Sequence, residues 1–221
     1  MKVLAIELSS SRRSACAWNS EAGSIPETIW DEDVSGGRNS RALALVESAL
    51  AAGGMERREV ECLALGLGPG SYTGVRVAIA IAQGWAAGLG IRVAGVSSAE
   101  ALARDSWREG VRGRTGIAFD AQRGELCVGW FEISETGVGK ASPLKLISAA
   151  AFVSAQPADL VLRGPDLSKL LPPTLHHSSH PSARSIAELA VQKGIWTRPS
   201  ELEPIYIRPD SYKTVADQAG R

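Results

Sequence analysis

The stretch that most clearly could take part in binding or catalysis is Gly-Pro-Gly-Ser-Tyr-Thr-Gly at residues 68–74. A strand-like run, 60–67, precedes it and a long apolar segment follows, so this glycine-rich turn would open a helix. Backbone N–H groups at a helix N-terminus can bind an anion; Gly70 could take a positive φ, and Ser71 could cap the helix. No Gly-Lys-Ser/Thr follows, so the stretch is not a Walker A loop. Phosphate binding and a tight strand-to-helix turn both stay open, and the turn is the simpler interpretation.

The helix predicted at 72–89 is apolar around its whole circumference. Arg76 is its only charged residue, which is typical of a helix buried on every side. The apolar run is too short and too interrupted to span a membrane. Ala80, Gly84 and Gly88 recur at a spacing of four and form a flat strip that another helix could approach closely. Because one sheet covers one side of a helix, we expect a partner on the other side.

A second predicted helix, 38–52, is also more apolar than packing on one sheet requires. Arg76 on the first helix either faces an anionic ligand or partner near the positive end of that helix, or reaches from a buried helix to solvent. The predicted partner-interface residues on the two helices are Arg38, Ala42, Leu45, Arg76, Ala80, Gly84 and Gly88.

Composition limits the classes of function. The 221 residues carry no net charge, so a free-standing nucleic-acid binder is disfavoured. Three widely spaced cysteines in apolar runs predict reduced, buried thiols in a cytoplasmic protein. The N-terminus has no signal-peptide pattern, and no membrane span is expected.

The order of predicted elements indicates an α/β protein with two related halves. Three antiparallel strands are followed by alternating helices and strands, and the order returns in reduced form after a joint at 110–114. We predict a first half, 1–110, on which the tail 195–221 packs, and a smaller second half, 111–194. Capping-box spacing at 97–100 starts a predicted helix that runs to about Arg108, and the same spacing recurs at 185–188 in a helix predicted at 183–193. A loop is predicted at 170–181.

Several motifs in order resemble the TsaB (YeaZ) family, bacterial subunits of the machinery that makes threonylcarbamoyladenosine (t6A) in tRNA. They are LAIELSS, GPGSYTG with VRVAIAIAQGWA, GVSSAEALA, IAFDAQRGELCVGWFE and EPIYIRPD. The resemblance implies the actin-like ATPase (ribonuclease H-like) fold. The chain departs from the family pattern at Glu7, usually aspartate, at Tyr72, usually phenylalanine, and at Asn39, often histidine. The region 139–184 matches poorly.

The actin-like resemblance also implies a place for a nucleotide. In active members of that fold, an acidic residue and the first hairpin loop hold phosphate and Mg²⁺. The positions of a vestigial nucleotide or phosphate site would be Glu7, Ser9, Ser10, Gly70, Ser71 and Asp120. The favoured alternative is that the two acids are strand-end carboxylates bonded to nearby backbone. We expect no catalytic residue, no metal ligand and no tightly bound cofactor; ATP or ADP with Mg²⁺ at the junction with a partner stays open.

The catalytic relative in this machinery carries a His-x-x-x-His metal pair on its first helix, where this chain has Asn39-Ser40-Arg41-Ala42-Leu43. We therefore expect a non-catalytic subunit that docks on the catalytic TsaD protein. The family further implies the ATPase TsaE as a partner, a homodimer when the chain is alone, and tRNA contact only through the complex. The alternatives are a self-sufficient actin-like enzyme, either an ATP-dependent kinase or a glycoprotease-like metallohydrolase, and a stand-alone tRNA-binding protein.

Overall fold

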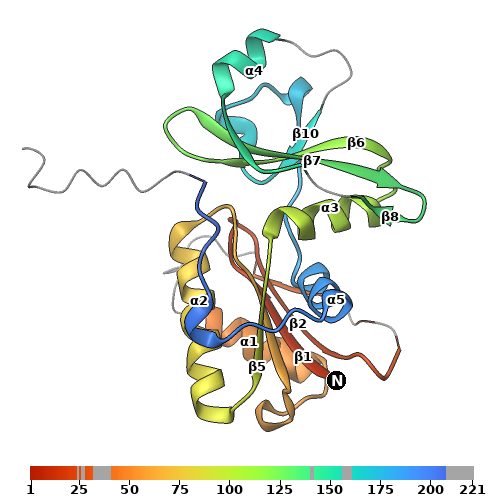
Figure 1. Cartoon of the computed structure of the whole chain (residues 1–221), viewed down its shortest axis with the longest axis vertical. Coiled ribbons are helices and arrows are strands. Elements are labelled where there is room, and N and C mark those ends of the chain that lie inside the picture. The colour runs from red at the N-terminus through yellow and green to blue at the C-terminus, as the bar shows by residue number, and fades with distance from the viewer. Residues whose placement is uncertain (24, 26–27, 32–40, 140–141, 156–160, 208–221) are drawn as a thin grey trace, which may run out of the picture.

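The computed structural model describes residues 1–23, 25, 28–31, 41–139, 142–155 and 161–207, and they build two sheets (Figure 1). The first sheet has the order β3-β2-β1-β4-β5. The strands β1 (Lys2–Glu7), β2 (Arg13–Asn19) and β3 (Ile29–Asp31) are antiparallel neighbours, and β4 (Cys62–Gly66) and β5 (Arg92–Val96) extend the sheet in parallel from β1.

Helices cover both faces of the first sheet. The helices α1 (Ala42–Ala52) and α2 (Tyr72–Leu89) share a core with one face, and α5 (Ala183–Lys193) packs on the other. Because both faces are covered, β1 reads as an unbroken apolar run and its consecutive side chains Val3, Leu4, Ala5 and Ile6 are all buried.

The second sheet has the order β11-β10-β6-β7-β8, with β9 also paired to β7. Its strands are β6 (Gly113–Asp120), β7 (Glu125–Ser134), β8 (Gly137–Val138), β9 (Lys145–Ser148), β10 (Leu162–Gly164) and β11 (His176–Ser178). The helix α3 (Ser98–Arg108) packs on one face and α4 (Ala149–Ala155) on the other. The strand β6 pairs antiparallel with β7 and parallel with β10, as β1 does with β2 and β4. The predicted α/β class with two related halves is confirmed.

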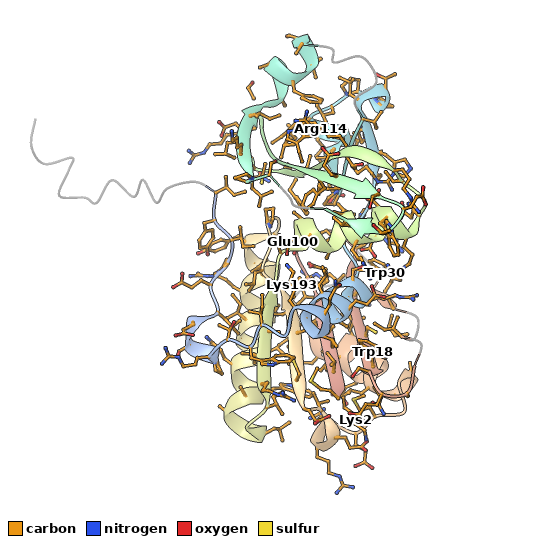
Figure 2. All side chains as sticks on the ribbon, turned by 45° about the vertical axis from the view of Figure 1, so that its right-hand side comes forward. Lys2, Trp18, Trp30, Glu100, Arg114 and Lys193 are labelled. Atoms are coloured by element: carbon orange, nitrogen blue, oxygen red, sulfur yellow. The ribbon has the colours of Figure 1, made fainter. Side chains whose placement is uncertain are left out.

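The helices α3 and α5 begin where they were predicted, but the caps differ from the capping boxes expected at 97–100 and 185–188. Ser97 precedes α3 without a side-chain cap bond, and Glu100 pairs with Lys193 of α5 at 2.6 Å (Figure 2). The cap of α5 is Ser182, whose hydroxyl accepts the backbone N–H of Ser185 at 3.2 Å. Neither predicted box forms; Glu100, Ser185 and Glu188 make tertiary contacts instead.

The predicted loop 170–181 contains the short strand β11, which pairs in parallel with β10. Its sequence, His-His-Ser, has no apolar alternation, so the prediction missed it.

The described part of the tail touches both halves. Thr197 donates its N–H to the carbonyl oxygen of Val93 in β5 at 3.0 Å, and Ile205 donates to Leu67 before the glycine-rich loop at 2.8 Å. Ile207 packs against the core cluster that contains Phe119 of the second sheet. The chain therefore crosses from the first half to the second a second time, beside the loop where α2 begins.

Candidate functional site

A cavity of about 820 Å³ lies between the two sheets. Both halves and the tail line it: Ser9–Ser11 and Arg13; Leu67–Thr73 and Val75; Phe119–Gln122, Cys127 and Leu146; Pro165, Asp166 and Lys169; and Pro204–Ile207. The glycine-rich loop thus lies in the wall of a cleft between the two halves. The volume of this cleft is in the range of small-molecule sites.

The glycines of this loop allow α2 to begin directly against the end of β1. A Cβ atom on Gly70, whose φ is 140°, would lie 2.1 Å from the carbonyl oxygen of Ser9, and one on Gly74 would lie 1.9 Å from that of Leu8. Ser71 donates its N–H to the Ser9 carbonyl at 2.6 Å, and its hydroxyl caps α2 by accepting the N–H of Gly74 at 3.2 Å. The loop is a tight strand-to-helix turn that fixes the start of α2.

Glu7 lies behind this wall and does not line the cleft. Its fully buried carboxylate accepts the N–H of Ser9 at 2.6 Å and the hydroxyl of Ser98 at 2.7 Å. The same Ser98 hydroxyl accepts the N–H of Gly68 at 3.1 Å. Burial raises the pKa of Glu7, while the bonds from Ser9 and Ser98 act in the opposite direction. Glu7 therefore ties together β1, the glycine-rich loop and the start of α3.

The two predicted acids do not form a shared Mg²⁺ site. Asp120 lines the cleft and accepts the N–H of Gln122 at 2.6 Å, whereas the Glu7 carboxylate is enclosed. Within the described ranges, no cluster of three histidine, cysteine, aspartate or glutamate side chains could hold a metal ion. The geometry matches strand-end carboxylates bonded to nearby backbone, and Mg²⁺ held between Glu7 and Asp120 does not fit.

The remaining positions of the predicted phosphate site do line the cleft. Gly70 and Ser71 form the turn, and Ser10 donates its hydroxyl to the carbonyl oxygen of Arg12 at 2.7 Å. The Ser9 hydroxyl oxygen is buried and has no hydrogen-bond partner among the described residues. Their role toward a phosphate group stays a prediction.

A polar contact across the cleft was not predicted. Ser11 donates its hydroxyl to Asp166 of the second half at 2.9 Å and lies 3.4 Å from His180 Nε2. In a hydrolytic triad the histidine stands between serine and acid. Here the acid accepts from the serine directly, and burial lowers the pKa of His180. The contact joins the halves, and sequence could not find it because its members lie more than 150 residues apart.

The outer face of α2 is exposed, and five of its exposed residues follow one another along the helix. Spaced by four, they form what we call the α2 stripe: Tyr72, Arg76, Ala80, Gly84 and Gly88. A Cβ atom added to Gly84 or Gly88 would have no heavy atom within 4 Å. Nothing described inside the chain explains these two glycines.

No helix in the described ranges is long and apolar enough to cross a membrane.

The helix α1 presents different residues from those predicted for the interface. Ala42 and Leu45 are only 3% and 6% exposed, because they face the first sheet and its core. This corrects their assignment to a partner surface. Leu43, at 57% exposure, is the large apolar side chain of α1 that faces outward. Arg38 lies outside the described residues.

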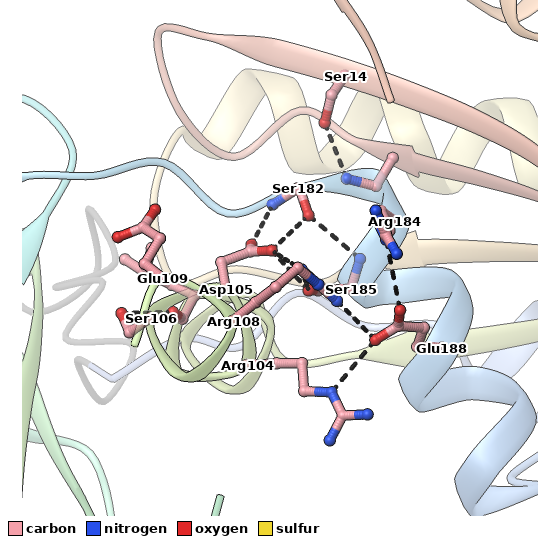
Figure 3. A network of polar contacts seen from close by, with 12 residues as sticks. Ser14, Arg104, Asp105, Ser106, Arg108, Glu109, Ser182, Arg184, Ser185 and Glu188 are labelled. Atoms are coloured by element: carbon pink, nitrogen blue, oxygen red, sulfur yellow. Dashed lines mark hydrogen bonds and ion pairs between the residues drawn. The ribbon is translucent and has the colours of Figure 1, made fainter. Parts of the chain in front are cut away.

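A polar network joins α3 to α5, the helices that flank the junction between the halves (Figure 3). Asp105 accepts the N–H and hydroxyl of Ser182 at 2.8 and 2.7 Å, the Ser185 hydroxyl at 2.7 Å and the Arg108 guanidinium at 2.8 Å. Arg108 also pairs with Glu188 at 2.7 Å. Burial raises the pKa of Asp105, and the hydrogen bonds and Arg108 oppose the rise. The network fixes α3 on α5 and thus one half on the other.

Comparison with known proteins agrees with this architecture. A family model described as TsaD, tRNA N6-adenosine threonylcarbamoyltransferase, matches residues 29–174, more than half of the chain. The tRNA threonylcarbamoyladenosine biosynthesis protein TsaB of Escherichia coli is 32% identical over 62% of this chain and 58% of its own length. The uncharacterized protein Rv3421c of Mycobacterium tuberculosis is 30% identical over 77% of this chain and 75% of its own.

The chain belongs to the TsaB (YeaZ) family, within the group of sequences that the TsaD model describes. The solved structure of YeaZ from Pseudomonas aeruginosa superposes with a TM-score of 0.75 over 93% of this chain and 99% of its own, at 24% identity. That likeness shows that the two chains share one fold. The match with the E. coli TsaB protein spans about three fifths of its length.

Proposed function

We propose that this protein is a non-catalytic subunit of the machinery that makes threonylcarbamoyladenosine in tRNA. It binds the catalytic TsaD protein through the α2 stripe and supports transfer of the threonylcarbamoyl group to the adenosine next to the anticodon. The names of its TsaB relatives support the pathway.

The observation that carries the docking role is the open space around Gly84 and Gly88. A glycine inside a helix costs about 1 kcal/mol relative to alanine, and here no contact within the described chain requires it. The axes of packed helices lie about 8–10 Å apart depending on the side chains at the contact, and small residues at the crossing point allow the closest approaches. Ala80 extends the same flat surface by one turn. The chain thus carries a helix face shaped for a helix outside itself.

The remaining partners follow from the same surface. Without the catalytic subunit, the α2 stripe would associate with a second copy, because apolar surface favours burial. The ATPase TsaE would join at the junction. The zero net charge supports tRNA contact through the assembled complex rather than through this chain alone. We place this activity in the cytoplasm.

A nucleotide site at the junction belongs to the same proposal. Tyr72 both lines the cleft and begins the α2 stripe, so a partner on α2 would border the cleft opening. ATP or ADP bound there would contact both subunits. The test is nucleotide affinity of the free chain and of the complex: the complex binds more tightly, and equal affinity would contradict a shared site.

The pathway assignment is tested by depleting the protein in cells and measuring threonylcarbamoyladenosine in tRNA. We expect the modified nucleoside to be lost on depletion and to return on complementation. A normal level after depletion would contradict the assignment. ATP turnover by the pure chain, abolished by Glu7→Ala or Asp120→Ala, would instead support the self-sufficient enzyme.

The docking surface is tested by co-purification with the catalytic subunit. Gly84→Leu and Ala80→Glu should abolish association while the chain stays folded. Ala151→Glu is the matched control, since Ala151 is an exposed alanine on α4 of the other half. Equal yields for all variants would show that α2 is not the interface.

A further inference from the structure

The α2 stripe changes character at its N-terminal end. Two tyrosines and an arginine gather there, which we call the Tyr72–Arg76–Tyr206 cluster. The Arg76 guanidinium lies 4.6 Å from the centre of the Tyr72 ring, and the Tyr206 ring from the tail lies 5.7 Å from that of Tyr72. Tyr72 and Tyr206 are 50% and 49% exposed. Tyrosine and arginine of this kind dominate the binding energy of many interfaces.

Arg76 has no acidic partner in the described part of this chain. It makes no ion pair there, although the arginines of the α3–α5 network, such as Arg104 and Arg108, all do. The Tyr72 ring contacts the guanidinium by a cation–π interaction, and the Tyr206 side chain shares a hydrogen bond with Arg76. A guanidinium has five N–H donors, so donors remain for a carboxylate from outside the chain. The cation is therefore positioned in advance beside a surface that association would cover.

A second copy of the chain cannot supply that acceptor from the same helices. The helix α2 contains no acidic residue. The one acid of α1 is Glu47, which already accepts from Arg57 at 2.9 and 2.6 Å. Pairing of two α2 stripes would thus cover Arg76 without a carboxylate, and a buried, unpaired charge is costly.

We propose that the Tyr72–Arg76–Tyr206 cluster recognises a carboxylate on a helix of the catalytic subunit. That carboxylate meets Arg76 as the partner helix crosses the small residues of the α2 stripe. The bidentate ion pair, backed by two aromatic rings, fixes the register of the two helices. It also favours the mixed complex over self-association, because the second copy leaves the cation unpaired.

This inference rests on the proposed docking role, so its test must separate the two. We would measure the Kd for the catalytic subunit and for self-association, at low and high salt, for the wild type and for Arg76→Gln, Gly84→Leu and Arg114→Gln. Arg114 is the matched control, because it also lies over an aromatic ring, Trp130, at 5.1 Å in the other half (Figure 2).

We expect Arg76→Gln to weaken the mixed complex at least about tenfold and to reduce its salt dependence. Self-association should not weaken and should tighten, because Arg76→Gln removes a charge that pairing of two α2 stripes would leave unpaired, and Arg114→Gln should change neither equilibrium. Reversing the responsible partner acid to arginine, identified by cross-linking from position 76, should restore binding to Arg76→Glu.

The failures are distinguishable. If Gly84→Leu abolishes the complex while Arg76→Gln binds like the wild type, the proposed contact between Arg76 and a partner carboxylate is wrong and the docking role stands. If Arg76→Gln weakens self-association as much as the mixed complex, the discrimination between partners is wrong. If neither variant changes the Kd of the mixed complex, both proposals fall.

Discussion

The two ends of α2 use glycine for opposite reasons. At the N-terminal end, Gly70 and Gly74 let the helix begin against Ser9 and Leu8, where a Cβ atom would overlap backbone oxygen at 2.1 or 1.9 Å. Toward the C-terminal end, Gly84 and Gly88 face empty space. The first pair serves the fold of this chain, and the second pair makes sense only with something outside it. A glycine-rich helix can therefore be divided into structural and docking parts by what surrounds each residue.

The largest effect should come from Gly74→Ala. The new methyl group would require the end of β1 or the first turn of α2 to move, and overpacking of this kind costs about 3 kcal/mol. Urea denaturation of the purified variant measures the loss in free energy of unfolding. A wild-type stability would show that this end of α2 is as tolerant as the other.

The same substitution further along the helix should have the opposite sign. Gly84→Ala meets nothing within 4 Å and improves helix propensity, so the dilute chain should gain about 1 kcal/mol and its Tm should rise by about 2–4 °C. Affinity for the catalytic subunit should fall at the same time. A destabilised Gly84→Ala variant would contradict the division between the two ends.

The smallest effect concerns the pH dependence of stability that arises from Glu7, which lies behind the loop where α2 begins. Burial raises the pKa of Glu7 above its ordinary 4.5, so the folded state keeps a proton that the unfolded state has lost. The free energy of unfolding should therefore fall as pH rises from 4.5 through the folded pKa. Burial also raises the pKa of Asp105, which changes the free energy of unfolding in the same direction.

Glu7→Gln isolates the contribution of Glu7, because it removes the titrating group and leaves Asp105 in place. Its stability relative to the wild type should improve steadily across that pH range in a urea series. Parallel curves for the two proteins would show that Glu7 does not hold a proton in the folded state.

The sequence predicted the central elements closely. The bounds of α2 and β5 agree with the structure to the residue, because strong local signals end them: the loop before Tyr72 and Gly90, whose φ is 68°. The apolar excess of α2 also pointed to its exposed stripe.

Other features depend on contacts that a linear pattern does not contain. Ser182 caps α5, and Asp105 holds that serine in place. On α1, Ala42 and Leu45 looked like surplus apolar residues, yet they face the sheet and Leu43 faces outward. The cleft contact of Ser11 joins segments that only folding brings together.

The Tyr72 and Tyr206 rings lie in the cleft wall and also at the head of the α2 stripe. Whatever occupies the cleft and whatever covers α2 would touch the same pair of rings. Binding free energies that share a contact are coupled, and the coupling acts equally in both directions. A cleft ligand that reorients these rings would change the affinity of the partner by the same factor by which the partner changes the affinity of the ligand.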